Sequence, residues 1–335
     1  MAEDQMREDT AESGTKESSS DPAVSVLVIS YNTSDMTLEC LRSLESTTQA
    51  PHEVIVLDNA SSDGSADAIA AAFPTEKFPH IRLIRSAENL GFAGGNNMAA
   101  PHARGRYILL LNPDTVVLEG AVDNLLAFAR EVPHAKIWGG RTIFPDGSLN
   151  PTSCLQRMTL WNVFCRTSGL GSLLPQSRIF NPEIYPGWDR DTVRAVDFVA
   201  GCLLLIEREF WDALGGFDLD YFMYGEEADL CERARKMGAD PHITPESVII
   251  HYSAASFPSR ADKMSLLLKG KIELVKRHFP TWQRPLGVAL VRLWPLTRVI
   301  ASGAATLVSR NSELQKTREM WSTVWSRRGQ WRDGY

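Results

Sequence analysis

Carboxylate and imidazole side chains stand at, or just beyond, the ends of apolar segments that are typical of buried strands. There are four such features: Asp58, Asp114, the pair Glu226 and Glu227, and His251. Ligands of open α/β sheets bind at the carboxyl ends of the strands, so we expect these side chains to converge. Carboxylate oxygens and an imidazole nitrogen suit Mg²⁺ or Mn²⁺, which substrate phosphates and water usually complete. The pattern therefore predicts a divalent cation and a bound nucleotide diphosphate.

A glycine-rich segment, ENLGFAGGNN (88–97), adds candidate ligand contacts. We predict a loop in which Gly91 and Gly94 let the backbone approach a ligand closely, while Asn97 offers a side-chain donor. On its own this segment is a weak indication, because most glycine-rich loops are only turns.

Four apolar segments alternate with helix-like stretches in the first third of the chain: 24–30, 53–58, 81–84 and 107–111. Such alternation is typical of an α/β fold with a parallel sheet covered on both faces. After about residue 140 the pattern changes. FPDG (144–147) predicts a hairpin-type turn, and VDFVAGCLLLIER (196–208) predicts one long mixed strand.

The composition places limits on the function. The 335 residues, 44% hydrophobic and 23% charged, fit one large or two ordinary globular domains. A net charge of −6 gives the whole chain no electrostatic footprint for nucleic acid. Five scattered cysteines without a CxxC pair argue against a disulfide framework and favour a cytoplasmic location. Residues 1–22 are polar and acidic and lack an apolar signal core, so we expect a disordered tail.

Residues 281–335 differ from the rest of the chain. They hold nine Lys and Arg against three Asp and Glu, and five of the nine tryptophans. A membrane-spanning helix over 285–308 would bury Arg292 and Arg298 at a cost of roughly 2.5–3.5 kcal/mol each at its centre. Two interpretations stay open: a helix that packs on the protein with its arginines paired, and a helix that lies on the membrane surface.

The order of several motifs resembles the family 2 glycosyltransferases of the rhamnosyltransferase-like branch. The motifs, in order between about residues 24 and 280, are VSVLVISYN, VLDNASSDGS, NLGFAGGNN, LLLNPDT, FVAGCLLLIEREFWDALGGFD, FMYGEEADLCERARKMG and VIIHYSAAS. The resemblance implies a GT-A fold at 23–280, with a Rossmann-like, mostly parallel central sheet, helices on both faces, and a C-terminal helical extension at 281–335. It also implies a nucleotide-sugar-binding half (23–118), an acceptor and catalytic half (119–280), an inverting mechanism and a divalent cation.

The resemblance also assigns the donor site residue by residue. Asp58 matches the aspartate that contacts the nucleotide base, and Asp114 in NPD matches the metal-binding aspartate, with His251 completing the metal site. Asn112 replaces the first aspartate of the usual DxD motif and either holds the loop or contacts the sugar. The other nucleotide-sugar contacts that the matching segments imply are Ser30, Asn32, Ser62, Asp63, Asn89, Gly91, Gly94 and Asn97. The remaining histidines have no comparable setting in the sequence.

The glutamate pair occupies the position of the family's general base. The family commonly has Glu-Asp here, so Glu227 takes the role of the base, with a side chain that is one methylene longer. Glu226 and Asp229 are the neighbouring candidates, although Asp229 points to another face of a helix. A purely structural interpretation is that acidic residues at a helix N-terminus stabilise its dipole.

The predicted function is transfer of a sugar from a nucleotide-sugar donor to a glycan or lipid-linked glycan of the cell surface. The preferred donor is dTDP-rhamnose. UDP- and GDP-sugars fit the same motifs. A sugar nucleotidyltransferase is disfavoured, because VISYNTSDM has neither the glycine nor the basic residue that a triphosphate requires. A non-catalytic carbohydrate-binding relative is the alternative outside enzymes.

Overall fold

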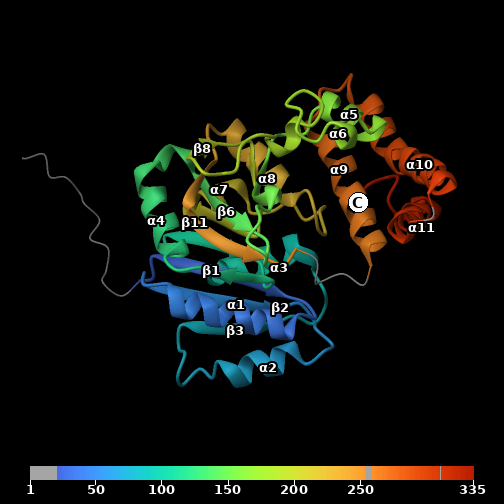
Figure 1. Cartoon of the computed structure of the whole chain (residues 1–335). Helices are drawn as coiled ribbons and strands as arrows, with labels where there is room; N and C mark the ends of the chain where they lie inside the picture. The colour runs from blue at the N-terminus through green and yellow to red at the C-terminus, as the bar shows by residue number, and fades with distance from the viewer. Residues whose placement is uncertain (1–20, 254–258, 310) are drawn as a thin grey trace, which may run out of the picture.

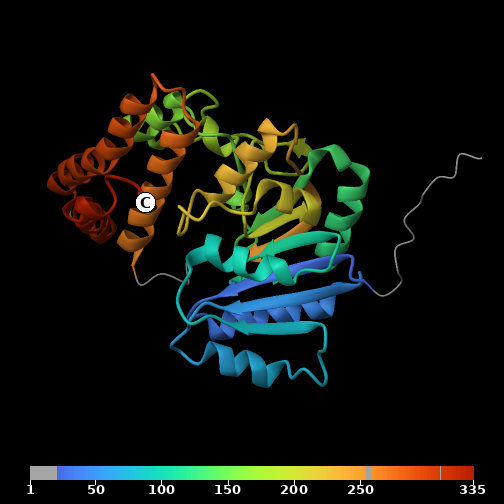
Figure 2. The same ribbon diagram turned by 180° about the vertical axis from the view of Figure 1, so that it is seen from behind.

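The computed structural model describes residues 21–253, 259–309 and 311–335. The predicted disordered tail, 1–22, lies outside the described residues except for its last two. The chain forms a central sheet with helices on both faces and a group of C-terminal helices beside it (Figure 1). The reverse view shows the same two parts (Figure 2).

The central sheet has the order β3-β2-β1-β4-β10-β6-β11-β5, with β8 paired to β11. Its strands are β1 (Val24–Ser30), β2 (His52–Asp58), β3 (Ile81–Arg85), β4 (Tyr107–Leu111), β5 (Thr115–Val117), β6 (Ile137–Ile143), β8 (Arg194–Ala195), β10 (Leu203–Glu207) and β11 (His242–His251). The first four along the chain are parallel, as the sequence predicts, while β10 runs antiparallel to both β4 and β6. The sheet is therefore mostly parallel.

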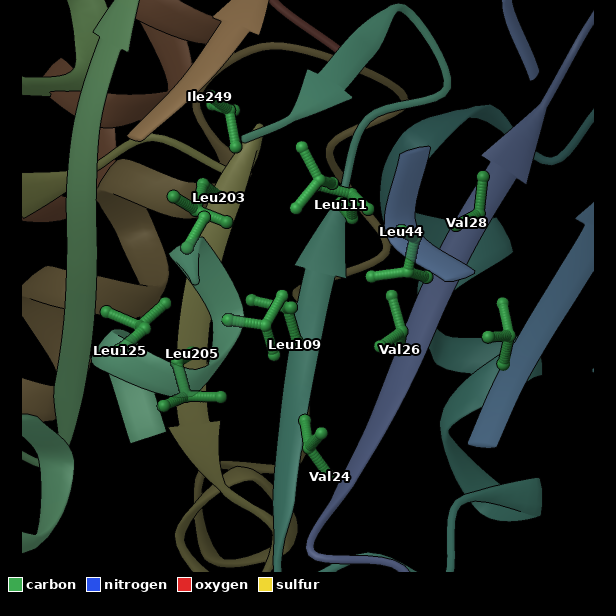
Figure 3. Packing of buried hydrophobic residues seen from close by; sticks show 14 of the residues in the cluster. Val24, Val26, Val28, Leu44, Leu109, Leu111, Leu125, Leu203, Leu205 and Ile249 are labelled. Carbon is green, nitrogen blue, oxygen red and sulfur yellow. The ribbon is translucent and has the colours of Figure 1, made fainter. Parts of the chain in front are cut away.

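Alternate residues of the buried strands face opposite sides, so two cores form. One contains Val26 and Leu109 and is covered by α1 (Ser34–Thr47), α2 (Ser65–Ala72) and α4 (Ala121–Glu131), as Figure 3 shows for part of it. The other contains Leu27 and Ile108 and is covered by α3 (Gly91–Ala99), α7 (Arg208–Leu214) and α8 (Glu226–Lys236). The period of two along each strand explains this division.

Two sequence expectations are wrong. The predicted strand 196–208 is broken by a turn, in which the amide of Leu203 donates to the carbonyl of Ala200. Its first part is β9 (Phe198–Val199), which pairs with β7 (Cys154–Leu155) outside the central sheet, and its second part is β10. Ala200, Gly201 and Cys202 of this turn line the pocket described below.

The second wrong expectation concerns the glycine-rich segment, most of which belongs to the helix α3 rather than to a loop. A Cβ at Gly95 would lie 2.8 Å from Cγ2 of Ile29, so the glycine lets α3 pack closely on β1. Gly91 has φ +71°, and a Cβ there would lie 2.1 Å from the carbonyl oxygen of Phe222. These glycines therefore serve packing between elements.

A third core joins the C-terminal helices. It contains residues of α5 (Leu160–Ser168), α9 (Arg260–His278), α10 (Arg284–Val308) and α11 (Ser312–Ser326), while the short α6 (Leu170–Leu173) follows α5. By length and composition alone, α10 is apolar enough to cross a membrane, with 22% of its most apolar stretch buried against the protein. Arg292 pairs with Asp333 at 2.7 Å, and Arg298 donates to the carbonyl of Arg166. The arginines are thus paired, as the packing interpretation predicts.

Candidate active site

A pocket of about 1590 Å³ opens between the carboxyl ends of the strands and the C-terminal helices. Seven of the predicted site residues line it: Asn89, Gly91, Asn112, Asp114, Glu226, Glu227 and His251. They come from four separate segments of the chain. The expectation that strand-end side chains converge is therefore met for the predicted metal site and the glutamate pair.

Strand register brings Asp114 and His251 together. The chain turns after β4 at Asn112 and Pro113 and returns as β5, which pairs with β11 so that Thr115 stands opposite His251. The amide of Tyr252 also donates to the carbonyl of Asp114. As a result, Nε2 of His251 lies 3.2 Å from Oδ1 of Asp114 in the pocket wall. The carboxylate that ends this buried turn faces an imidazole from a distant strand.

The pair suits a divalent cation. Burial alone would lower the pKa of His251, but Cys202 and the hydrogen bond with Asp114 outweigh it and raise this pKa to about 10. The site thus favours positive charge between the two side chains, which a bound cation supplies in place of a proton. Nδ1 of His251 has no hydrogen-bond partner among the described residues, and Nδ2 of Asn112 lies 3.4 Å from Nε2. One oxygen and one nitrogen form an incomplete set that phosphate oxygens and water can complete.

The glutamate pair begins α8 and lines the same pocket. Oε1 of Glu227 lies 3.4 Å from the amide of Gly201, which donates to it. Burial raises the pKa of Glu227, and burial together with the charge of Glu227 raises the pKa of Glu226 well above its ordinary value. Oε2 of Glu226 has no partner among the described residues. A carboxyl group whose pKa is moved toward neutrality is suited to accept a proton during a reaction.

Asp229 has a different setting. Its Oδ1 lies 2.7 Å from Nε2 of His278, and its Oδ2 lies 2.7 Å from Nε of Arg233. Burial would raise the pKa of Asp229, but the hydrogen bonds and charges of these two partners lower it. Oδ1 therefore links α8 to α9 through His278, Oδ2 pairs with Arg233 one turn along α8 itself, and Asp229 is not among the residues that line the pocket. This contact fits the structural interpretation of Asp229.

The predicted base-contact region forms a connected loop next to the pocket. The amide of Ser62 donates to Oδ1 of Asn32, and the amide of Asn32 donates to Oγ of Ser61, which ties the loops after β1 and β2 together. Oδ2 of Asp58 accepts from the amide of Ser61, whereas its buried Oδ1 has no partner among the described residues. An unpartnered buried oxygen suits a ligand donor.

Other predicted donor contacts are used within the protein. Oγ of Ser30 lies 3.0 Å from Oγ1 of Thr37 on α1, and Asp63 accepts from both the amide and the hydroxyl of Ser65 at the start of α2. Asn97 exchanges two hydrogen bonds with the backbone of Phe217. Ser30, Asp63, Asn97 and Gly94 do not line the pocket. The structure therefore does not bring them together with the other predicted nucleotide-sugar contacts.

The segment before Glu226 is held by the C-terminal part of the chain. A Cβ at Gly270 of α9 would lie 1.7 Å from the carbonyl oxygen of Tyr224, so this glycine permits direct contact. The hydroxyl of Tyr335 accepts from the amide of Met223 at 3.1 Å and donates to its carbonyl. The amide of Tyr335 donates to Glu273 of α9. The extension thus helps to place the glutamate pair, a contact that no local sequence signal indicates.

Several pocket residues were missed in the sequence. Asn59 follows Asp58 directly and binds Asn89 and Gly91 through its side chain, so its position could have identified it. Lys263 and His278 project from α9 into the pocket wall and carry no strand-end signal. Burial lowers the pKa of Lys263, although its ammonium lies close enough to Asp114 to feel that charge. A basic residue here can meet a diphosphate.

Comparison with known proteins shows what the chain is similar to. Residues 25–187 match the family described as glycosyl transferase family 2. The chain is 28% identical over 282 residues to the N-acetylglucosaminyl-diphospho-decaprenol L-rhamnosyltransferase of Mycobacterium tuberculosis. The aligned region covers 78% of this chain and 87% of that protein. The chain is also 27% identical over 240 residues to rhamnosyltransferase WbbL of Escherichia coli, covering 69% of this chain and 83% of WbbL.

The fold has solved counterparts. The mannosyltransferase PcManGT from Pyrobaculum calidifontis, in complex with GDP-Man and Mn²⁺, aligns with a TM-score of 0.56 at 17% identity, covering 93% of this chain and 88% of that chain. At this identity the alignment supports the GT-A-like fold alone. Residues 25–187 therefore match glycosyl transferase family 2, the chain has a GT-A-like fold, and proteins named rhamnosyltransferases are among its relatives.

Proposed function

We propose that the protein transfers rhamnose from dTDP-rhamnose to a glycan or lipid-linked glycan with inversion at the anomeric carbon. The observation that carries the proposal is the placement of Asp114 and His251 in the same pocket as Glu227. Rhamnose is preferred because two relatives bear that activity in their names. The lipid-linked acceptor follows from the decaprenol in the name of the mycobacterial relative.

The proposed reaction is a single displacement. Glu227 takes the proton of an acceptor hydroxyl, whose oxygen attacks the anomeric carbon of the donor sugar. The bond between that carbon and the diphosphate oxygen breaks, and the electron pair leaves with the nucleoside diphosphate. Asp114 and His251 would hold Mg²⁺ or Mn²⁺, which stabilises negative charge on the leaving diphosphate when bound. In this proposal Asp58 contacts the nucleotide base and Lys263 binds the phosphates; the unpartnered Oδ1 of Asp58 and the position of Lys263 in the pocket wall support these roles.

A transfer assay tests the proposal. Purified protein with Mn²⁺ is given dTDP-rhamnose, a UDP-sugar or a GDP-sugar, together with an N-acetylglucosaminyl-diphospho-polyprenol acceptor. The expected result is a glycosylated lipid product with dTDP-rhamnose and little product with the other donors. Product from a UDP- or GDP-sugar alone would contradict the rhamnose assignment, and release of nucleotide from no donor would favour a carbohydrate-binding relative.

We further propose that α10 contacts the cytoplasmic membrane surface. One face of the helix carries four apolar side chains at seven-residue intervals that are between 46% and 87% exposed: Leu286, Leu293, Ile300 and Leu307. The other face packs in the third core through Val291 and Trp294. Leu286 also lines the pocket, so this apolar row begins at the pocket. An interfacial helix of this kind buries its apolar face at the headgroup boundary.

Charge on this row should weaken membrane binding. Replacing both Leu293 and Ile300 by glutamate is expected to lower cosedimentation with anionic vesicles at least about tenfold, since each change removes an apolar contact and adds repulsion. Val193→Glu, at an exposed apolar site away from α10, is the matched control. Unchanged sedimentation of the double variant would remove the membrane proposal while leaving the transfer proposal intact.

A further inference from the structure

A second group of metal-ligating side chains lies at the other end of the sheet from the pocket. Glu45 is on the last turn of α1, His52 is the first residue of β2, and His80 directly precedes β3. Asp58, next to the candidate active site, is the last residue of β2, so the whole length of that strand separates the two places. We propose that Glu45, His52 and His80 form a structural transition-metal site for Zn²⁺.

The donor atoms already face one another. Oε1 of Glu45 lies 3.1 Å from Nε2 of His52, and Oε2 lies 2.8 Å from Nε2 of His80. One donor atom from each side chain lies within 4.8 Å of the others. Two imidazole nitrogens and one carboxylate oxygen are a ligand set that Zn²⁺ accepts, with a fourth position open to water. Only small side-chain shifts are needed to surround an ion.

A hydrogen bond outside the ligand set orients His52. Its Nδ1 lies 2.8 Å from the carbonyl oxygen of Ala50, an acceptor, so Nδ1 must carry the proton. That assignment leaves the lone pair of Nε2 directed at Glu45, where a metal would bind. A backbone carbonyl behind a ligating histidine is the usual way in which proteins fix the metal-binding tautomer. Without a metal, the same contacts require a doubly protonated His52.

The surroundings separate this group from ordinary surface ion pairs. All three side chains are half-buried, and the ring of Phe78 lies 6.3 Å from that of His80. Asp123, whose carboxylate accepts from the amides of Gln49 and Ala50, adds negative charge near His52. A metal here would join α1, β2 and the segment before β3. This proposal is independent of the proposed function.

The described residues contain one other three-residue group, His134, Asp240 and His242. It is less organised, because His134 and Asp240 are exposed, whereas all three members of the first group are half-buried. Glu45, His52 and His80 therefore form the better candidate, and the other group provides an internal control.

The test is a Zn²⁺ titration of chelator-treated full-length protein by calorimetry. It is performed in a His251→Gln background, so that the candidate active site contributes little. We expect one Zn²⁺ ion to bind per chain. Glu45→Gln and His80→Gln should each lower the Zn²⁺ affinity by more than the roughly 10–100-fold that is lost when a residue that only supports a ligand is replaced. His102→Gln, at an exposed histidine outside both groups, and His134→Gln should bind as before. Co²⁺ should give the visible absorption of a tetrahedral site only when His80 is present.

Folding of the variants is checked separately by thermal unfolding without metal. Zn²⁺ should raise the midpoint of the parent protein and leave that of folded His80→Gln unchanged. The proposal would be overturned if the folded parent did not bind Zn²⁺ stoichiometrically, or if the parent and His80→Gln bound Zn²⁺ equally. Loss of binding in His134→Gln alone would also overturn it, since the ion would then belong to the other group.

Discussion

Replacing Glu227 by glutamine is expected to lower kcat for sugar transfer by about 10²–10⁴-fold, the contribution of a positioned general base. Glutamine keeps the size of the side chain and can still contact Gly201, but it cannot accept the acceptor proton. The KM for the donor should change little, because Glu227 acts on the acceptor hydroxyl. Steady-state kinetics with saturating donor measures both quantities.

Glu209→Gln is the matched control, since Glu209 is an exposed glutamate in the first turn of another helix. It should retain the parent rate. If Glu227→Gln retains more than about a tenth of the parent kcat, the base is another group, and Glu226 is the next to be replaced.

The pH dependence of kcat/KM should reflect the same carboxyl group. Burial raises the pKa of Glu227 above its ordinary value of 4.5. The active form is the carboxylate, so activity should be full above this raised pKa and fall as the pH decreases through it. Because Glu226 also titrates with a raised pKa in the same pocket, the acid limb belongs to the pair. An acid limb at or below 4.5 would contradict this account of the base.

Replacing Asp114 by asparagine is expected to lower kcat/KM on the order of 10²–10³-fold. This corresponds to a loss of several kcal/mol of transition-state stabilisation. Asparagine preserves the turn after β4 but gives a weaker ligand for a hard cation beside His251. The loss should be accompanied by a higher concentration of Mn²⁺ for half-maximal rate. Initial rates over a Mn²⁺ series, after treatment with chelator, measure both effects.

Asp146→Asn, in the exposed turn before β7, is the control and should behave as the parent protein does. Parent-like activity of Asp114→Asn, with an unchanged Mn²⁺ requirement, would show that the cation is held elsewhere.

The sequence predicted those parts of the site that depend on strand ends. Asp114 follows β4 and His251 is the last residue of β11, and pairing of β5 with β11 brings the two together. Packing determined what was missed. Gly95 has the appearance of a loop glycine, yet it lies in α3, where the absence of a side chain lets the helix pack closely against Ile29. That contact comes from Ile29 of β1, 66 residues earlier in the chain (95 − 29), which no local pattern reveals.

Tertiary partners also decide which polar residues are available for ligands. Ser30 and Asp63 have suitable types and positions, but Thr37 and Ser65 use their oxygens. Conversely, Lys263 reaches the pocket from a helix whose own sequence suggests only an amphipathic surface. His52 and His80 had no apparent setting until the fold placed Glu45 between them.

The most direct test of the central claim is metal-dependent nucleotide binding. The thermal unfolding midpoint of the full-length protein would be measured with dTDP, UDP and GDP, each with and without Mn²⁺, for the parent and Asp114→Asn. The account predicts that dTDP with Mn²⁺ raises the midpoint of the parent, and that this rise is lost without Mn²⁺ or in Asp114→Asn. An equal rise in both proteins, or a rise that does not need Mn²⁺, would contradict a cation-bound diphosphate between Asp114 and His251.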